Sequence, residues 1–113
     1  MTLFKDFELE VVKVLTSEVL SQDLRARLIA EAQLVGLTYT GAGYFLTVQH
    51  SELPLGRTVC NGPLIIGEAD GIECGFIIFL ENRELTLECH GWGNSIPDVY
   101  RELDVSISYS QPE

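Results

Sequence analysis

The most reactive side chains in this sequence belong to three cysteines and two histidines, at Cys60, Cys74, Cys89, His50 and His90. Structural zinc ligands usually come in pairs about two to four residues apart, and these positions follow no such spacing. Cys89 and His90 are adjacent, but neighbours in a strand point to opposite faces. Catalysis by a cysteine nucleophile remains an alternative, because cysteine and histidine are both present, but no local motif supports it. We expect no metal and no cofactor, and we interpret the cysteines as small core residues.

Carboxylates form a second group with potential chemistry. Glu81, Glu84 and Glu88 are close in sequence, and Glu84 and Glu88 should share one face of a strand. Paired carboxylates can catalyse hydrolysis or hold a cation, but no third ligand joins them with Asp-x-Asp spacing. The segment from Leu64 to Asp104 contains nine acidic residues and only two arginines, so it carries −7 of the net charge of −10. The acidic face is either a solvated surface or a docking surface for a basic protein.

The segment His90-Gly91-Trp92-Gly93-Asn94 is the most unusual local feature, since it places the only tryptophan between two glycines. Trp92 either folds back over the edge of the core or forms an exposed anchor beside the acids. Aromatic anchors in interfaces contribute on the order of 2 kcal/mol or more. We therefore predict Trp92 and Tyr100 as anchors, with Asp98 and Glu102 as charge partners beside them.

These residues must be positioned by two kinds of element. Apolar residues at three- and four-residue spacing predict a helical hairpin over residues 1–33. Ser21 should cap its second helix, which we expect to end near Gly36. Two-residue alternation then predicts an antiparallel sheet over residues 34–110. The predicted strands are 35–40, 44–49, 57–60, 64–66, 73–80, 85–90 and 103–109.

The order of these elements predicts a single α+β domain, with the N-terminal helical hairpin packed on one face of a twisted, mainly antiparallel sheet. The strand 73–80 is apolar on both faces, so we place it in the centre of the sheet and under the helices.

The composition argues against several classes of binding partner and indicates a cellular compartment. The 113 residues carry a net charge of −10, which argues against direct binding to nucleic acid or to an anionic membrane. We find no signal-peptide pattern and no apolar run of membrane-spanning length. Three cysteines without a CxxC pair favour a reduced, cytoplasmic protein.

The run Gly75–Leu80, the Leu87-Glu88 pair, Trp92-Gly93 and Ile96-Pro97 together resemble small bacterial immunity proteins. These are the antitoxins of contact-dependent growth inhibition and related polymorphic toxin systems. The resemblance covers roughly residues 62 to 104. It implies a cytoplasmic, non-enzymatic protein that binds a cognate toxin domain, often a basic nuclease, and blocks its active site.

Our leading hypothesis is therefore an immunity protein that neutralises a toxin by direct contact through Glu81, Glu84, Glu88, Trp92, Asp98, Tyr100 and Glu102. A second hypothesis is a small regulatory or structural module that forms a weak homodimer through the exposed strand Leu103–Tyr109. A third is an enzyme that uses His90 or a cysteine.

Overall fold

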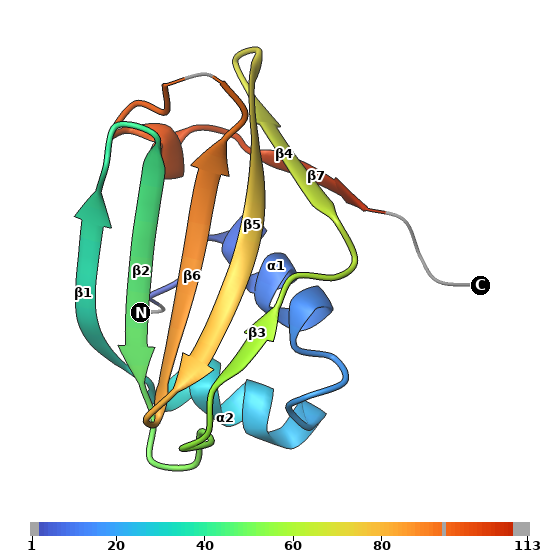
Figure 1. Ribbon diagram of the computed structural model, residues 1–113, viewed down its shortest axis with the longest axis vertical. Coiled ribbons are helices and arrows are strands. Elements are labelled where there is room, and N and C mark those ends of the chain that lie inside the picture. Colours follow the sequence, from blue (N-terminus) through green and yellow to red (C-terminus); the bar gives the residue numbers. More distant parts are fainter. Residues whose placement is uncertain (1–2, 94, 110–113) are drawn as a thin grey trace.

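A computed structural model of the chain describes residues 3–93 and 95–109. Within them, two helices precede a twisted antiparallel sheet of seven strands, which confirms the predicted α+β class (Figure 1). The elements are α1 (Asp6–Leu15), α2 (Gln22–Glu31), β1 (Gln33–Tyr39), β2 (Gly43–Gln49), β3 (Thr58–Cys60), β4 (Ile65–Ala69), β5 (Ile72–Glu81), β6 (Glu84–Gly91), the 3-10 helix η1 (Tyr100–Glu102) and β7 (Ser106–Tyr109). Residues 1–2 of the predicted helical hairpin, Asn94 and Ser110 lie outside the described residues.

The strands follow the order β1-β2-β6-β5-β4-β7, and β3 pairs with the same edge of β5 as β4. Strand β5 therefore has β6 on one side and both β3 and β4 on the other. Its predicted central place is confirmed. Strands β1 and β7 lie at the two ends of this order.

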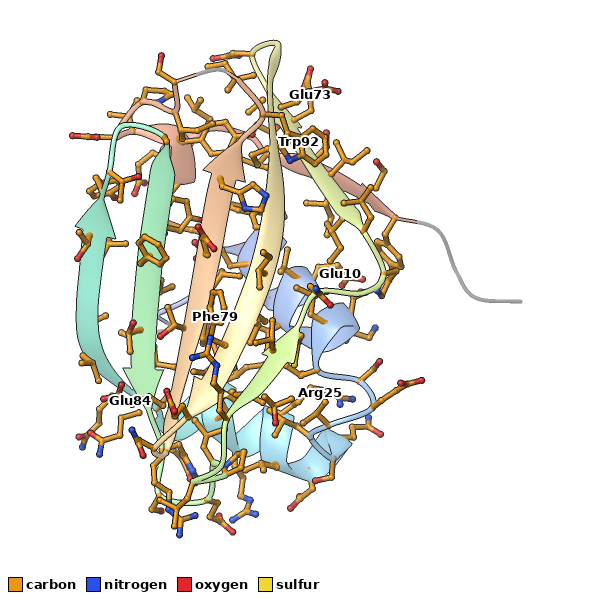
Figure 2. The ribbon with its side chains drawn as sticks, in the orientation of Figure 1. Glu10, Arg25, Glu73, Phe79, Glu84 and Trp92 are labelled. Atoms are coloured by element: carbon orange, nitrogen blue, oxygen red, sulfur yellow. The ribbon has the colours of Figure 1, made fainter. Side chains whose placement is uncertain are left out.

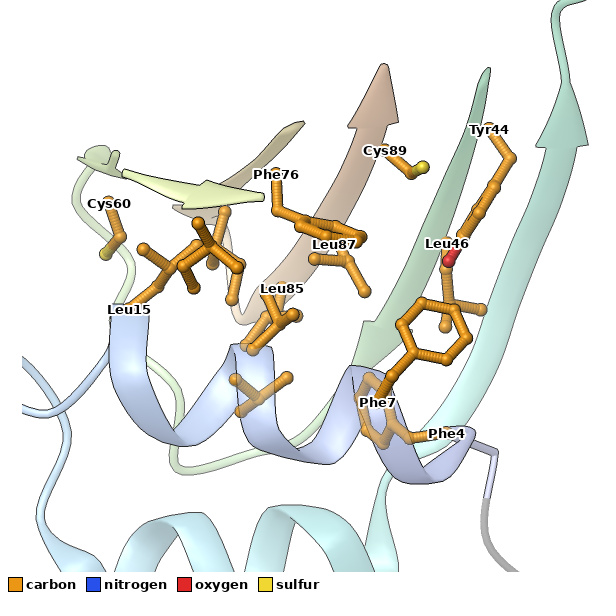
Figure 3. Packing of buried hydrophobic residues seen from close by; sticks show 14 of the residues in the cluster. Phe4, Phe7, Leu15, Tyr44, Leu46, Cys60, Phe76, Leu85, Leu87 and Cys89 are labelled. Carbon is orange, nitrogen blue, oxygen red and sulfur yellow. The ribbon is translucent and has the colours of Figure 1, made fainter. Parts of the chain in front are cut away.

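Both helices lie on one face of the sheet, and the core fills the space between them and the strands (Figures 1 and 3). Helix α1 turns Val11, Val12 and Leu15 toward the sheet, where they are buried. Strand β6 meets them with every second residue, including Leu85 and Leu87. Each such side chain stabilises the fold by about 1.5–3 kcal/mol when fully buried.

Helix α2 begins as predicted and ends earlier than predicted. The Ser21 side chain accepts a hydrogen bond from the backbone N–H of Leu24 at 3.1 Å, which confirms the cap. The helix ends at Glu31, and Ala32 is already extended, so the predicted end near Gly36 is wrong. Only Leu28 of α2 is buried, and pairing with β2 therefore outcompetes another helical turn.

The C-terminal strand is shorter than predicted. Strand β7 begins at Ser106, while residues 100–102 form η1 and Leu103 leads out of it. Pairing with β4 is restricted to Ser106–Tyr109, opposite Ile65–Glu68. Neither α1 nor α2 is long and apolar enough to cross a membrane, and the same holds for every other helix among the described residues.

Candidate functional site

The sheet face that points away from the helices is uncovered, and we call it the open face (Figure 2). Period-two alternation decides which residues lie on it, because their neighbours in each strand are buried against the helices. Its residues on β2, β4, β5 and β6 are Gly43, Phe45, Thr47, Gln49, Ile66, Glu68, Glu73, Gly75, Ile77, Phe79, Glu81, Glu84, Thr86, Glu88 and His90.

Acids stand directly opposite acids on the open face. Glu68 of β4 pairs in register with Glu73 of β5, and Glu81 of β5 pairs with Glu84 of β6. Figure 2 shows Glu73 and Glu84 near opposite ends of the sheet. Like charges in such cross-strand positions destabilise a sheet. A local conflict of this kind is expected where a surface serves function rather than stability.

The centre of the open face is apolar with one carboxylate inside it. Glu88 lies in register between Phe45 of β2 and Ile77 of β5, and all three side chains are half-buried. Two residues along β5, the Arg57 guanidinium lies 6.0 Å above the centre of the Phe79 ring. Within the described part of the chain, Glu88 has no ion pair and no side-chain hydrogen bond. This carboxylate is therefore free to accept a cation.

Trp92 lies against the open face and covers Gly75 of β5 (Figure 2). A Cβ atom added to Gly75 would lie 3.0 Å from Trp92 Cζ2 and 2.9 Å from His90 Nε2. Nevertheless 42% of Trp92 remains exposed. The tryptophan thus folds back on the sheet and still presents an aromatic surface beside the acids. Only a glycine at position 75 leaves room for this placement.

Replacing Gly75 by valine should lift Trp92 off the sheet, because the larger side chain fills its seat. We expect a red-shifted fluorescence emission from this single tryptophan and little loss of stability, since valine favours strands. Gly36→Ala is the matched control, because a Cβ at Gly36 meets nothing within 4 Å. An unchanged emission wavelength in the Gly75 variant would show that Trp92 is not seated against Gly75.

The structure divides the predicted partner-binding residues into two groups. Glu81, Glu84 and Glu88 share the open face with Trp92. The other three follow Trp92 in sequence, but the chain carries them away from that face.

Tyr100 was predicted as an exposed anchor, and this is wrong. It is fully buried, and its hydroxyl donates to the backbone carbonyl of Ile72 at 3.0 Å. The reason is that Ile96 and Tyr100, four residues apart, both face the core beneath the sheet end. A tyrosine satisfies such a position by burying its ring and bonding its hydroxyl to the backbone.

Asp98 and Glu102 do not join the open face. Glu102 lies beside the start of α1, where its carboxylate pairs with Lys5 Nζ at 3.1 Å on the helix side of the sheet. Asp98 is exposed in the loop before η1, two residues after Ile96, whose N–H donates to the carbonyl of Gly41 at the β1–β2 turn. We therefore remove both acids from the candidate site.

A buried ionic cluster around Glu8 was not predicted. Glu8 of α1 is fully buried and accepts hydrogen bonds from Arg101 Nε and NH2, each at 2.7 Å. The Tyr44 hydroxyl donates to the same carboxylate, as does the backbone N–H of Lys5. Burial and the negative charge of Glu8 raise the pKa of Tyr44 above its ordinary range. This cluster fixes η1 against α1 and leaves no group exposed for chemistry.

One signal in the sequence pointed to Glu8. It lies four residues after Phe4 and three before Val11, within the apolar stripe of α1. A charge in that stripe requires a buried partner. The sequence offered seven basic residues, and only the three-dimensional arrangement identifies Arg101 as the one that pairs.

On the helix side, a groove of about 880 Å³ lies between the end of α1, β3 and Tyr109. Its lining includes Cys60, and burial raises the pKa of that thiol, which keeps it protonated. Residues 3–93 and 95–109 contain no group of three His, Cys, Asp or Glu side chains placed to hold a metal ion. The open face is therefore the better candidate site.

Comparison with known proteins gives no match: no family model fits the chain, and no curated protein or solved structure shows significant similarity to it.

Proposed function

We propose that this protein binds a basic protein through the open face. The observation that carries the proposal is the pairing of acid against acid, at Glu68–Glu73 and Glu81–Glu84, around an uncovered apolar centre. A basic partner would relieve both repulsions and would cover that centre in the same event. The net charge of −10 would also accelerate the encounter with such a partner.

We further propose that the partner is a toxin domain and that this chain is its immunity protein, acting in the cytoplasm. A toxin that cleaves nucleic acid presents cations that bind phosphates. The carboxylates of the open face would occupy those cations in place of the phosphates, and Trp92 would anchor the contact. Inhibition of this kind requires no catalytic residue in the inhibitor.

The experiment that tests the proposal uses the adjacent upstream gene. Its C-terminal domain is co-expressed with this protein, and both co-purification and survival of the host cells are measured. We expect a stable complex, and toxicity that appears only when this protein is omitted. A toxic domain that neither co-purifies with this chain nor is neutralised by it would contradict the immunity role.

A further inference from the structure

We propose that two copies of this chain associate through the outer edge of β1, joining their sheets into one. Strand β1 pairs with β2 alone, so its other edge carries unpaired backbone groups. Leu34 is 53% exposed and Val35 is 51% exposed on this strand. This edge is distinct from the open face, so the association and the proposed function can each hold without the other.

The charge distribution singles out this edge. Residues 32–51, which contain the whole β1–β2 hairpin, include no Asp, Glu, Lys or Arg, in a chain with a net charge of −10. Natural edge strands are normally protected by charge or by being short. The edge of β7 is only four residues long, and that of β3 is three residues long and follows Arg57. Among the described strands, β1 has the longest unprotected edge.

An uncharged edge on an acidic chain favours another copy as the occupant. A basic partner would be drawn to the acids elsewhere, while two like-charged chains repel least where neither carries charge. Antiparallel pairing also puts the two Glu31 side chains, just before β1, at opposite ends of the paired segment. Parallel pairing would bring them together, so the antiparallel arrangement with two-fold symmetry is favoured.

The hairpin fixes the register of this pairing. The Thr40 N–H donates to the Gly43 carbonyl within the hairpin, and alternate residues of an antiparallel strand point their backbone groups the other way. Leu37 and Tyr39 thus offer their N–H and C=O groups to the outer edge. A bulge between Leu34 and Gly36 limits straight pairing to residues 36–39. In the symmetric register, Leu37 of one copy faces Tyr39 of the other, and the two Thr38 residues face each other.

A disulfide cross-link tests this register. Opposed residues of the non-hydrogen-bonded type lie about 4.5 Å apart between Cα atoms, within reach of a disulfide. We expect Thr38→Cys to form a covalent dimer under oxidised glutathione. Thr40→Cys is the matched control, because the two copies of that residue lie roughly four strand positions apart. Equal cross-linking of both variants, or none in either, would overturn the proposed register.

Sedimentation of the unmodified chain tests the association itself, over a series from about 1 to about 500 μM. We expect the sedimentation coefficient to rise toward that of a dimer as the protein concentration increases. Thr38→Glu should abolish this rise, because the two copies of residue 38 face each other. Val59→Glu on β3 and Val19→Glu between the helices add the same charge at exposed positions, and both should still dimerise. A chain that stays monomeric throughout, or a dimer lost in Val59→Glu but kept in Thr38→Glu, would overturn the inference.

Discussion

Replacing Glu8 by alanine is expected to lower the free energy of unfolding by about 3–5 kcal/mol, because Arg101 then stays buried without its counter-charge. Arg101 Nε and NH2 each lose an acceptor at 2.7 Å, and the Tyr44 hydroxyl loses its acceptor as well. The measurement is urea denaturation at neutral pH, followed by circular dichroism.

Glu10→Ala provides the matched control on the same helix. Glu10 is half-buried and accepts one hydrogen bond from the Tyr109 hydroxyl at 3.3 Å, so its loss should cost no more than about 1 kcal/mol. Replacing both Glu8 and Arg101 by apolar residues of similar size should restore much of the stability, since no unpaired charge remains. Equal midpoints for the Glu8 and Glu10 variants would contradict this account.

Reversing the charge of Glu88 should give the largest loss of affinity for the proposed basic partner. Disrupting a buried charge pair in an interface costs about 2–5 kcal/mol, which corresponds to a rise in Kd of roughly thirty-fold or more. Glu88→Lys places a cation between Phe45 and Ile77, where we expect a cation of the partner. Titration calorimetry with the proposed partner, the purified C-terminal domain encoded by the adjacent upstream gene, measures the effect.

Glu18→Lys separates a local contact from a general effect of charge. It makes the same change in net charge at an exposed position between α1 and α2, on the helix side. It should alter the association rate slightly and leave the dissociation rate unchanged. If both variants weaken binding equally, the attraction is long-range, and the open face is not the contact.

Periodicity predicted the parts of this fold that depend on local sequence. Alternation in β5 and β6 was enough to place Glu84 and Glu88 on one face, because a strand turns every second residue the same way. Spacing in α1 and the Ser21 cap likewise needed only neighbouring residues. The class α+β follows from the order of such elements.

The rest of the fold and of the candidate site depends on contacts between residues that are distant in the sequence. Glu88 lies between Phe45 and Ile77 only because β6 pairs with both β2 and β5, and Glu8 meets Arg101 only when η1 packs against α1. Tyr100 closely follows Trp92 in sequence, but it is buried in the core whereas Trp92 lies on the open face. Between the two residues the chain leaves the sheet and turns into the core.

The Glu8–Arg101 pair also orders events during synthesis. The ribosome adds Arg101 to the growing chain 93 residues after Glu8. Until Arg101 emerges, water is the better environment for that carboxylate, and docking α1 on the growing sheet would bury a lone charge. A chain interrupted before Arg101 would therefore keep its first helix undocked and open to proteases. The pair therefore distinguishes a chain that extends past Arg101 from one that stops before it.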